Sequence, residues 1–209
     1  MKKIVVILCI ICLYFLYQFN IIEHKKYTNE DFKIENYYSK YDKDQDGIDD
    51  QSDILEGVRA YLKTKPKYQS KYYDGGYPDD EYGVCSDVVI NGLLNAGYDL
   101  KILVDEDIKA YPNRYDINKA DNNIDFRRVK NLAIYFKYHA ISLTTDVYDL
   151  DKWQGGDIVV FKKHIGIVSN YRNHHSVSFL IHHAYKRQLH YEEDVLEKRN
   201  DIIGHYRIS

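Results

Sequence analysis

The chain has 209 residues, which suits one globular domain with an additional N-terminal segment rather than two full domains. Its formal net charge is -3 and it has no basic cluster, so it lacks the electrostatic footprint of a nucleic-acid-binding protein and we expect no nucleic-acid partner. The 22 tyrosines fit a biased overall composition better than a tyrosine-rich binding surface.

The chain begins with an apolar segment. Two lysines precede an uncharged run from Ile4 to Ile22, close to the ~20 residues that span a bilayer. No small-residue cleavage site follows this run. We therefore predict that residues 1–22 are an uncleaved signal anchor, held in the membrane through residues 4–22, with the rest of the chain on the extracellular face. A cleaved signal peptide and a secreted protein are the alternative. Residues 23–41 are polar, have no period and are predicted to be a juxtamembrane spacer.

Residues 42–53, DKDQDGIDDQSD, have the spacing of a calcium-binding loop, with Gly47 at its sharp turn. So many carboxylates repel one another unless a hard cation neutralises them. The last position is aspartate rather than the glutamate of EF-hands, so the run resembles the short extracellular loops of thrombospondin type 3 repeats. We predict a structural Ca²⁺ and no organic cofactor, with a solvated acidic linker as the alternative. The predicted ligands are five carboxylates and one backbone carbonyl, from Asp42, Asp44, Asp46, Ile48, Asp50 and Asp53.

Residues 54–209 are predicted to form one domain in which helices precede strands. Apolar residues recur at helical spacing in ILEGVRAYLKTKP, SDVVINGLLNA, LKILVDEDIKAY and VKNLAIYFKYHA. Asp53 is expected to cap the first helix and Pro66 to end it, while Gly97 suits the position after the second. The β-branched and aromatic runs DIVVF, HIGIVS and SVSFLIHH predict strands. This order favours an α+β fold with N-terminal helices packed on a small antiparallel sheet.

Cys85 lies outside the apolar segment, and a lone thiol in an exported chain has no partner for a structural disulfide. It precedes an apolar helix, whose first N–H groups and dipole can stabilise a thiolate or an oxyanion, although Asp87 opposes a thiolate. His164 begins a predicted strand and could take the thiol proton. Either His182 or His183 could orient that imidazole, and strand alternation favours His183. The alternative is a buried cysteine that acts as a small apolar residue.

Two adjacent arginines, Arg127 and Arg128, lie in a dense polar cluster with Asp125. Arginine binds carboxylates in bidentate geometry, so both are candidates for substrate binding. The alternative is that Asp125 caps the next helix and the arginines pair on its surface. Asp157 is expected to close a turn as part of the scaffold. The nine histidines contain no H-E-x-x-H motif, so no zinc site is expected.

The segments YYDGGYPDDEYGVCSDVV, NIDFRRVKNL, WQGGDIVVF, HIGIVS, IHHA and GHYR resemble, in order, the bacterial domain-of-unknown-function family numbered 1287. That family is similar to the papain-like superfamily of NlpC-type cell-wall cysteine peptidases, which implies a papain-like fold. In that group the nucleophile begins a helix in a motif like D-C-S-G, the base begins a strand like HVGIY, and the third residue lies in a run like FIHA. The resemblance implies these roles for Cys85, His164 and His182. Asp87 replaces the usual glycine, and NYRNHHS lengthens a turn.

Together these features predict a cell-surface cysteine amidase or peptidase, a hydrolase acting on peptide amide bonds. Peptidoglycan stem peptides or crosslinks are the expected substrates, because peptidoglycan is the abundant amide polymer outside the anchor. The alternative is a non-catalytic domain of the same fold that binds the cell wall or another partner and uses the calcium loop as a structural clip.

Overall fold

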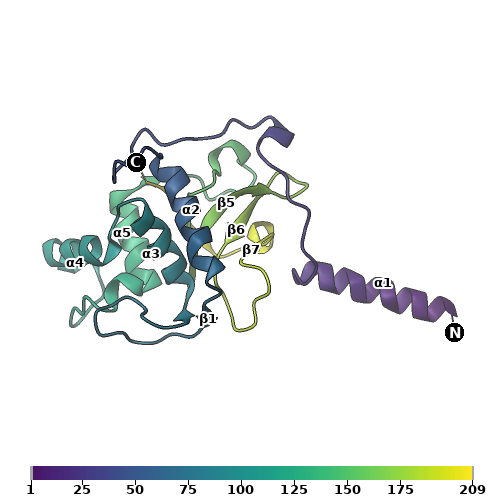
Figure 1. The fold of residues 1–209 in the computed structure, drawn as a ribbon, viewed down its shortest axis with the longest axis horizontal. Coiled ribbons are helices and arrows are strands. Elements are labelled where there is room, and N and C mark those ends of the chain that lie inside the picture. Colours follow the sequence, from purple (N-terminus) through teal and green to yellow (C-terminus); the bar gives the residue numbers. More distant parts are fainter. Residues whose placement is uncertain (1, 209) are drawn as a thin grey trace.

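The structure is a computed structural model that describes residues 2–208. Its helices are α1 (Lys2–Gln18), α2 (Asp50–Lys63), α3 (Cys85–Asn95), α4 (Leu100–Ala110) and α5 (Val129–His139). Its strands are β1 (Lys67–Tyr68), β2 (Tyr82–Gly83), β3 (Ile141–Ser142), β4 (Ile158–Phe161), β5 (His164–Arg172), β6 (Ser178–Ile181), β7 (Glu192–Glu193) and β8 (Ile202–Arg207). Helices α2 to α5 gather on one side of the molecule and β5 to β7 on the other, while α1 projects away (Figure 1). The chain is therefore a mixed α and β protein, as the sequence predicts.

Six strands form one antiparallel sheet in the order β3-β8-β4-β5-β6-β7, and β1 and β2 form a separate parallel pair. Both faces of the large sheet are covered. Ile158 and Val160 of β4 pack with the helices, whereas Val159 and Phe161 join a second apolar cluster on the opposite face. All of β6 is buried for the same reason. Alternation along β6 therefore does not separate a core face from a solvent face, and it gives no ground for preferring His183.

Helices α2 and α3 pack closely because each has a glycine where the other helix approaches. A Cβ atom on Gly92 of α3 would lie 2.5 Å from a methyl carbon of Val58 in α2. Helix α2 begins earlier than the apolar period indicates. Asp49, not Asp53, is its N-cap and accepts hydrogen bonds from the first N–H groups of the helix. Helix α3 follows the prediction: it begins at Cys85, and Gly97 has a φ of +78° just beyond its end.

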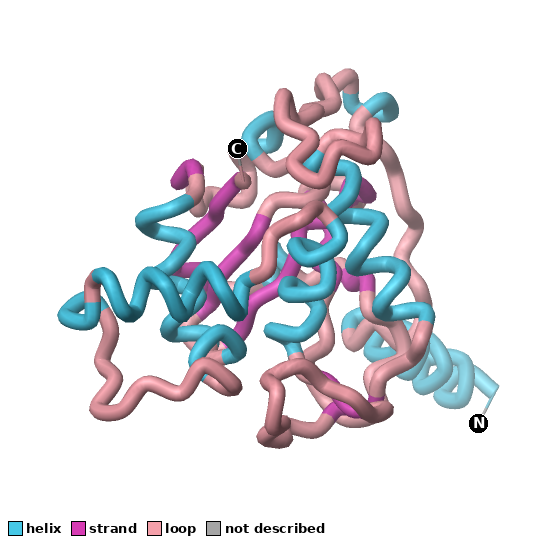
Figure 2. Tube along the Cα trace, turned by 60° about the vertical axis from the view of Figure 1, so that its left-hand side comes forward, coloured by secondary structure: helices cyan, strands magenta, loops and turns pink. Residues whose placement is uncertain are grey.

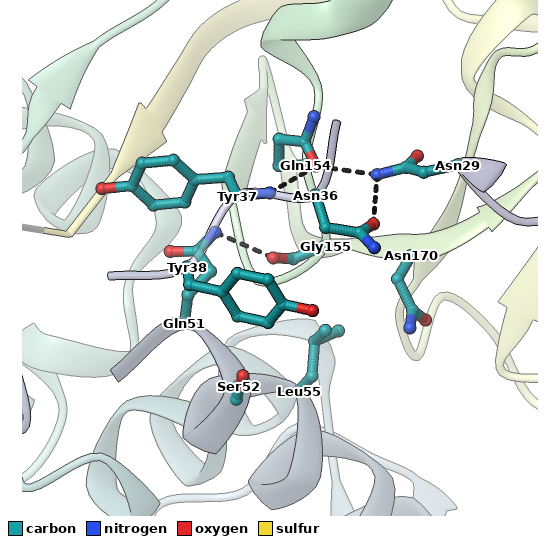
Figure 3. A pocket seen from close by; sticks show the side chains of 10 residues that line it. All are labelled: Asn29, Asn36, Tyr37, Tyr38, Gln51, Ser52, Leu55, Gln154, Gly155 and Asn170. Atoms are coloured by element: carbon teal, nitrogen blue, oxygen red, sulfur yellow. Dashed lines mark hydrogen bonds between the residues drawn. The ribbon is translucent and has the colours of Figure 1, made fainter. Parts of the chain in front are cut away.

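Residues 23–41, which we call the N-terminal strap, are packed on the domain and are not a free spacer. Tyr27 pairs with Arg172 of β5 through N–H to C=O bonds of 2.9 and 2.8 Å. Asn29 donates to Asn36 at 2.8 Å and to Gln154 at 2.9 Å, as Figure 3 shows. Most of these partners are polar and distant in sequence. No hydrophobic period in residues 23–41 therefore predicts that the strap packs on the domain. The small pocket in Figure 3 lies at this junction, and Asn29, Asn36 and Gln154 in its lining bond to one another.

Helix α1 spans 17 residues and has no buried side chain. It extends away from the rest of the protein in Figure 1, and Figure 2 shows it apart from the helices that cover the sheet. Within residues 2–208, no helix combines the length and the apolar character needed to cross a membrane. The end of α1 contacts the domain: the ring of Tyr17 stacks on His24 with centroids 3.8 Å apart, and Lys198 donates to the carbonyl of Gln18.

Candidate functional site

Cys85 is the first residue of α3 and is 8 % exposed. Its sulfur lies near the backbone N–H of Ile165, the residue that follows His164 at the start of β5. Burial raises the pKa of the Cys85 thiol, and the N–H groups of Ile165 and Ser86 offset that rise only in part. The helix start therefore places the thiol where the sequence predicts, but the resting thiol is protonated.

Asp87 caps the same helix through its own side chain. Its carboxylate accepts the N–H of Val84 at 2.8 Å and binds the guanidinium of Arg127 through two hydrogen bonds of 2.8 Å each. Both partners of this ion pair are buried. Asp87 still raises the pKa of the Cys85 thiol, but burial has the larger effect. The negative charge of Asp87, two residues after the thiol, is thus paired with Arg127 inside the protein.

The structure pairs Arg127 with a carboxylate of the protein itself. Its Nε and Nη2 donate to Asp87 and its Nη1 donates to the carbonyl of Lys71, so the buried guanidinium already has partners inside the protein. Arg128 differs, because its side chain is 44 % exposed and lies 3.1 Å from a carboxylate oxygen of Asp125. Arg128 stays a candidate for substrate binding, and Arg127 holds Asp87.

His164 and His182 are brought together. Nε2 of His164 lies 2.8 Å from Nδ1 of His182, and Nε2 of His182 lies 3.0 Å from a carboxylate oxygen of Glu193. All three residues are buried or nearly so. Glu193, in β7, was not among the sequence candidates, since it lies in a polar run of mixed charge that carries no motif. The result is a connected series of two imidazoles that ends on a carboxylate.

The carboxylate fixes the protons of this series, which we assign from the hydrogen bonds. An ionised Glu193 only accepts, so Nε2 of neutral His182 carries a hydrogen and its Nδ1 is an acceptor. Nε2 of His164 must then donate to that Nδ1. Nδ1 of His164 is consequently unprotonated and, within residues 2–208, has no hydrogen-bond partner. Burial and the neighbouring His182 lower the pKa of His164 to about 3, so this imidazole is neutral at rest.

The resting pair is thus a neutral thiol and a neutral imidazole. In the part of the chain that the structure describes, no hydrogen bond joins the Cys85 sulfur to an imidazole. The two residues are nevertheless linked through the start of β5, because the sulfur approaches the residue next to His164. Catalytic hydrogen bonds are often long before substrate binds, so this geometry is compatible with proton transfer during attack.

His183 lies next to two tyrosines, one of which is near the thiol. The edge of its ring meets Tyr68 and Tyr191 at centroid distances of 5.0 and 5.2 Å. Burial and the nearby Cys85 raise the pKa of Tyr68. A groove of about 420 Å³ opens over these three aromatic rings. The charged residues that line the groove are all basic: Lys65, Lys67, Lys186 and Arg187.

His183 is expected to make the protein sensitive to acid. Burial lowers its pKa to about 4, below the ~6.5 of an unfolded chain, and its Nδ1 is buried without a partner. Its contribution to stability is complete above pH 6.5 and is lost as the pH falls toward 4. Between pH 7 and pH 5 it should remove about 2 kcal/mol from the free energy of unfolding. Urea unfolding at the two pH values should show this loss for wild type and a loss smaller by that amount for His183→Asn. Equal losses would contradict the assignment.

Asp157 has the scaffold role that the sequence predicts, with more partners than a turn requires. It accepts two hydrogen bonds of 2.7 Å from Arg207 and lies 3.1 Å from Nε2 of His205. It also accepts the N–H of Gln154 and a side-chain bond from Gln51. Strand β8 is therefore tied to the turn before β4.

The acidic loop is only partly arranged as expected. Carboxylate oxygens of Asp42, Asp44 and Asp46 lie within 4.8 Å of one another. Asp50 does not join them, because its carboxylate accepts the N–H of Lys43 and the hydroxyl of Tyr98. Asp53 is not in this group either, so the structure brings together only three of the five predicted carboxylates.

Comparison with known proteins places these residues in a wider group. A family model described as "Domain of unknown function (DUF1287)" matches residues 55–208, which include Cys85, His164, His182 and Glu193 but not the acidic loop. The chain is 38 % identical over 167 residues to "Uncharacterized protein YijF" of Escherichia coli (strain K12), which covers 74 % of this chain and 80 % of that protein. No solved structure matches the chain.

Proposed function

This chain belongs to the DUF1287 family, and we propose that it is a cysteine amidase or peptidase of papain-like, NlpC-type architecture in which Cys85 is the nucleophile. The observation that carries the proposal is the series Glu193–His182–His164. It leaves an unprotonated Nδ1 on the residue that begins β5, and the sulfur of Cys85 lies against that strand start. This chemistry requires a nucleophile, a base near it and a third group that orients the base.

In the proposed reaction the sulfur attacks the carbonyl carbon of an amide while the thiol proton passes to Nδ1 of His164. The resulting imidazolium is stabilised through His182 by the charge of Glu193. The negative oxygen faces the first N–H groups of α3. When the C–N bond breaks, His164 returns the proton to the leaving amine and a thioester remains on Cys85. A water molecule, deprotonated by His164, then releases the acid and the free thiol.

The groove lined by Tyr68, a residue near the thiol, supports a substrate that carries carboxylates. Its charged lining residues are the three lysines and the arginine named above, so it attracts anionic groups. Peptidoglycan stem peptides have free carboxylates beside their amide bonds, and we propose them or their crosslinks as the substrate. This proposal goes with a location outside the cell, either anchored through residues 4–22 or secreted.

A non-catalytic domain that binds the cell wall is the second candidate, and one observation favours it. Burial raises the pKa of the Cys85 thiol and lowers that of His164, which is the pattern of two neutral buried side chains rather than of a resting ion pair. In that case the groove would bind its ligand without cutting it.

Alkylation of Cys85 separates the two candidates. The exposed Cys9 and Cys12 are first replaced by serine, so that iodoacetamide reports on Cys85 alone. Burial by itself makes a thiol slower than a free thiol at pH 6, so a faster rate requires a base that takes the proton. For the amidase we expect Cys85 to react faster than a free thiol, and His164→Gln to slow it at least about 10-fold. A slow rate that His164→Gln leaves unchanged would favour the binding domain.

A further inference from the structure

The loop before α2 gathers exposed carboxylates around a tight turn. Asp42, Asp44 and Asp46 each bring an oxygen within 4.8 Å of the others. The turn is formed at Gly47, whose φ is +97° and whose N–H donates to Asp42 at 2.9 Å. The loop also lies against the end of α3, since a Cβ atom on Gly97 would be 3.2 Å from that of Asp44. An acidic cluster on a surface can exist without any ligand, so these facts alone define no site.

Asp53 supplies a second observation. It lies in the first turn of α2, is 1 % exposed, and its Oδ2 is buried without a hydrogen-bond partner. A buried carboxylate with an unpaired oxygen is costly unless a cation or a donor satisfies it. Burial, with repulsion from Asp46 and Asp44, raises the pKa of Asp53 to about 6. Asp53 is not among the oxygens within 4.8 Å of one another, but the repulsion requires its buried carboxylate to lie near Asp44 and Asp46.

We propose that Asp42, Asp44, Asp46 and Asp53 bind one Ca²⁺ ion, with the backbone carbonyl of Ile48 as a further ligand. The donors are all oxygens and include no imidazole or thiolate, which favours a hard cation over zinc or copper. The cluster offers several protein oxygens to one ion, which suits Ca²⁺, whereas Mg²⁺ is usually bound through one or two carboxylates and keeps several waters. Asp50 is not a ligand, because Lys43 and Tyr98 hold its carboxylate.

The ion would join segments that the fold otherwise joins weakly. Four of its ligands precede α2, the fifth lies in its first turn, and the loop packs on the end of α3. Helix α2 packs mainly on α3, and α3 begins at Cys85. Calcium would thus fix the start of α2 against the helix that carries the thiol. The site depends only on these oxygens and not on any activity of the thiol.

Calorimetric titration with CaCl₂ should show one site with a dissociation constant of about 10⁻⁴–10⁻³ M, the range of extracellular calcium modules. Thermal unfolding in about 5 mM CaCl₂ should occur several degrees higher than in EGTA, and the same concentration of MgCl₂ should have a smaller effect. No heat and no shift with wild type would overturn the proposal. An equal shift with Mg²⁺ would do so too, because it would indicate screening of charge rather than a site.

Two variants locate the ion. Asp44→Ala with Asp46→Ala should abolish the calcium heat, and Asp53→Asn should weaken binding at least about 10-fold, as expected for loss of a charged ligand. In EGTA both proteins should be at least as stable as wild type, because repulsion is relieved, so a loss of binding cannot be ascribed to unfolding. Asp116→Ala is the matched control, since that side chain is 99 % exposed and remote in sequence. Variants that bind calcium like wild type would overturn the proposal.

Discussion

Release of soluble fragments from purified peptidoglycan is expected to fall at least about 10³-fold when Cys85 is replaced by alanine. The reason is that alanine leaves no atom to form the thioester, while the groove and the first N–H groups of α3 stay in place. His164→Ala should cause a loss of similar size, and the double variant should lose little more, because nucleophile and base act in one step. Chromatography of the released muropeptides measures the effect.

Cys12→Ser is the control for this experiment, since Cys12 is exposed in α1 and far along the chain from the thiol site. It should release fragments at the wild-type rate. If Cys85→Ala releases as much as wild type, the activity does not depend on the thiol and the amidase proposal fails. Release by neither protein, together with slow alkylation of Cys85, would favour the wall-binding domain.

Arg127→Ala is expected to lower the free energy of unfolding by about 3–5 kcal/mol, the cost of leaving a buried charge unpaired. The charge left behind is that of Asp87, which is wholly buried and would keep only its bond from the N–H of Val84. The neighbouring Arg128→Ala is the matched control. Its side chain is largely exposed, and such ion pairs contribute at most about 1 kcal/mol.

Urea unfolding followed by fluorescence measures both arginine variants. Similar losses for the two would contradict the difference in burial on which the prediction rests. Because Asp87 also caps α3, the Arg127 variant should in addition change the alkylation rate of Cys85, whereas the Arg128 variant should not. This second measurement links the ion pair to the position of the thiol.

Sequence predicted well those features that depend on neighbouring residues. The start of α3 at Cys85 follows from an apolar helical period and from Gly97 beyond its end. The start of β5 at His164 follows from a β-branched run after a turn. Both placements need only local preferences, and the structure agrees with them. The family resemblance is supported by the match over residues 55–208.

Features that depend on distant partners were not predictable. Arg127 and Arg128 are adjacent and chemically equal in sequence, and only the approach of Asp87, forty residues earlier, separates their roles. Glu193 reaches His182 because the two-residue strand β7 pairs with β6. No sequence pattern predicts that pairing. Asp50 lies outside the acidic cluster because its carboxylate accepts the hydroxyl of Tyr98, a residue beyond the end of α3. In each case tertiary contact, not local propensity, decides what a side chain does.

The N-terminal strap sets how far the domain can travel from α1. That helix ends at Gln18, and His24 is already held to Asp194 of the domain by a buried bond of 2.8 Å. Residues 19–23 between them span at most about 18 Å when fully extended. The linker between α1 and the domain is therefore short. If α1 is held at a bilayer, the groove stands at one nearly constant height above the lipid, and only the layer of polymer at that height comes within its reach.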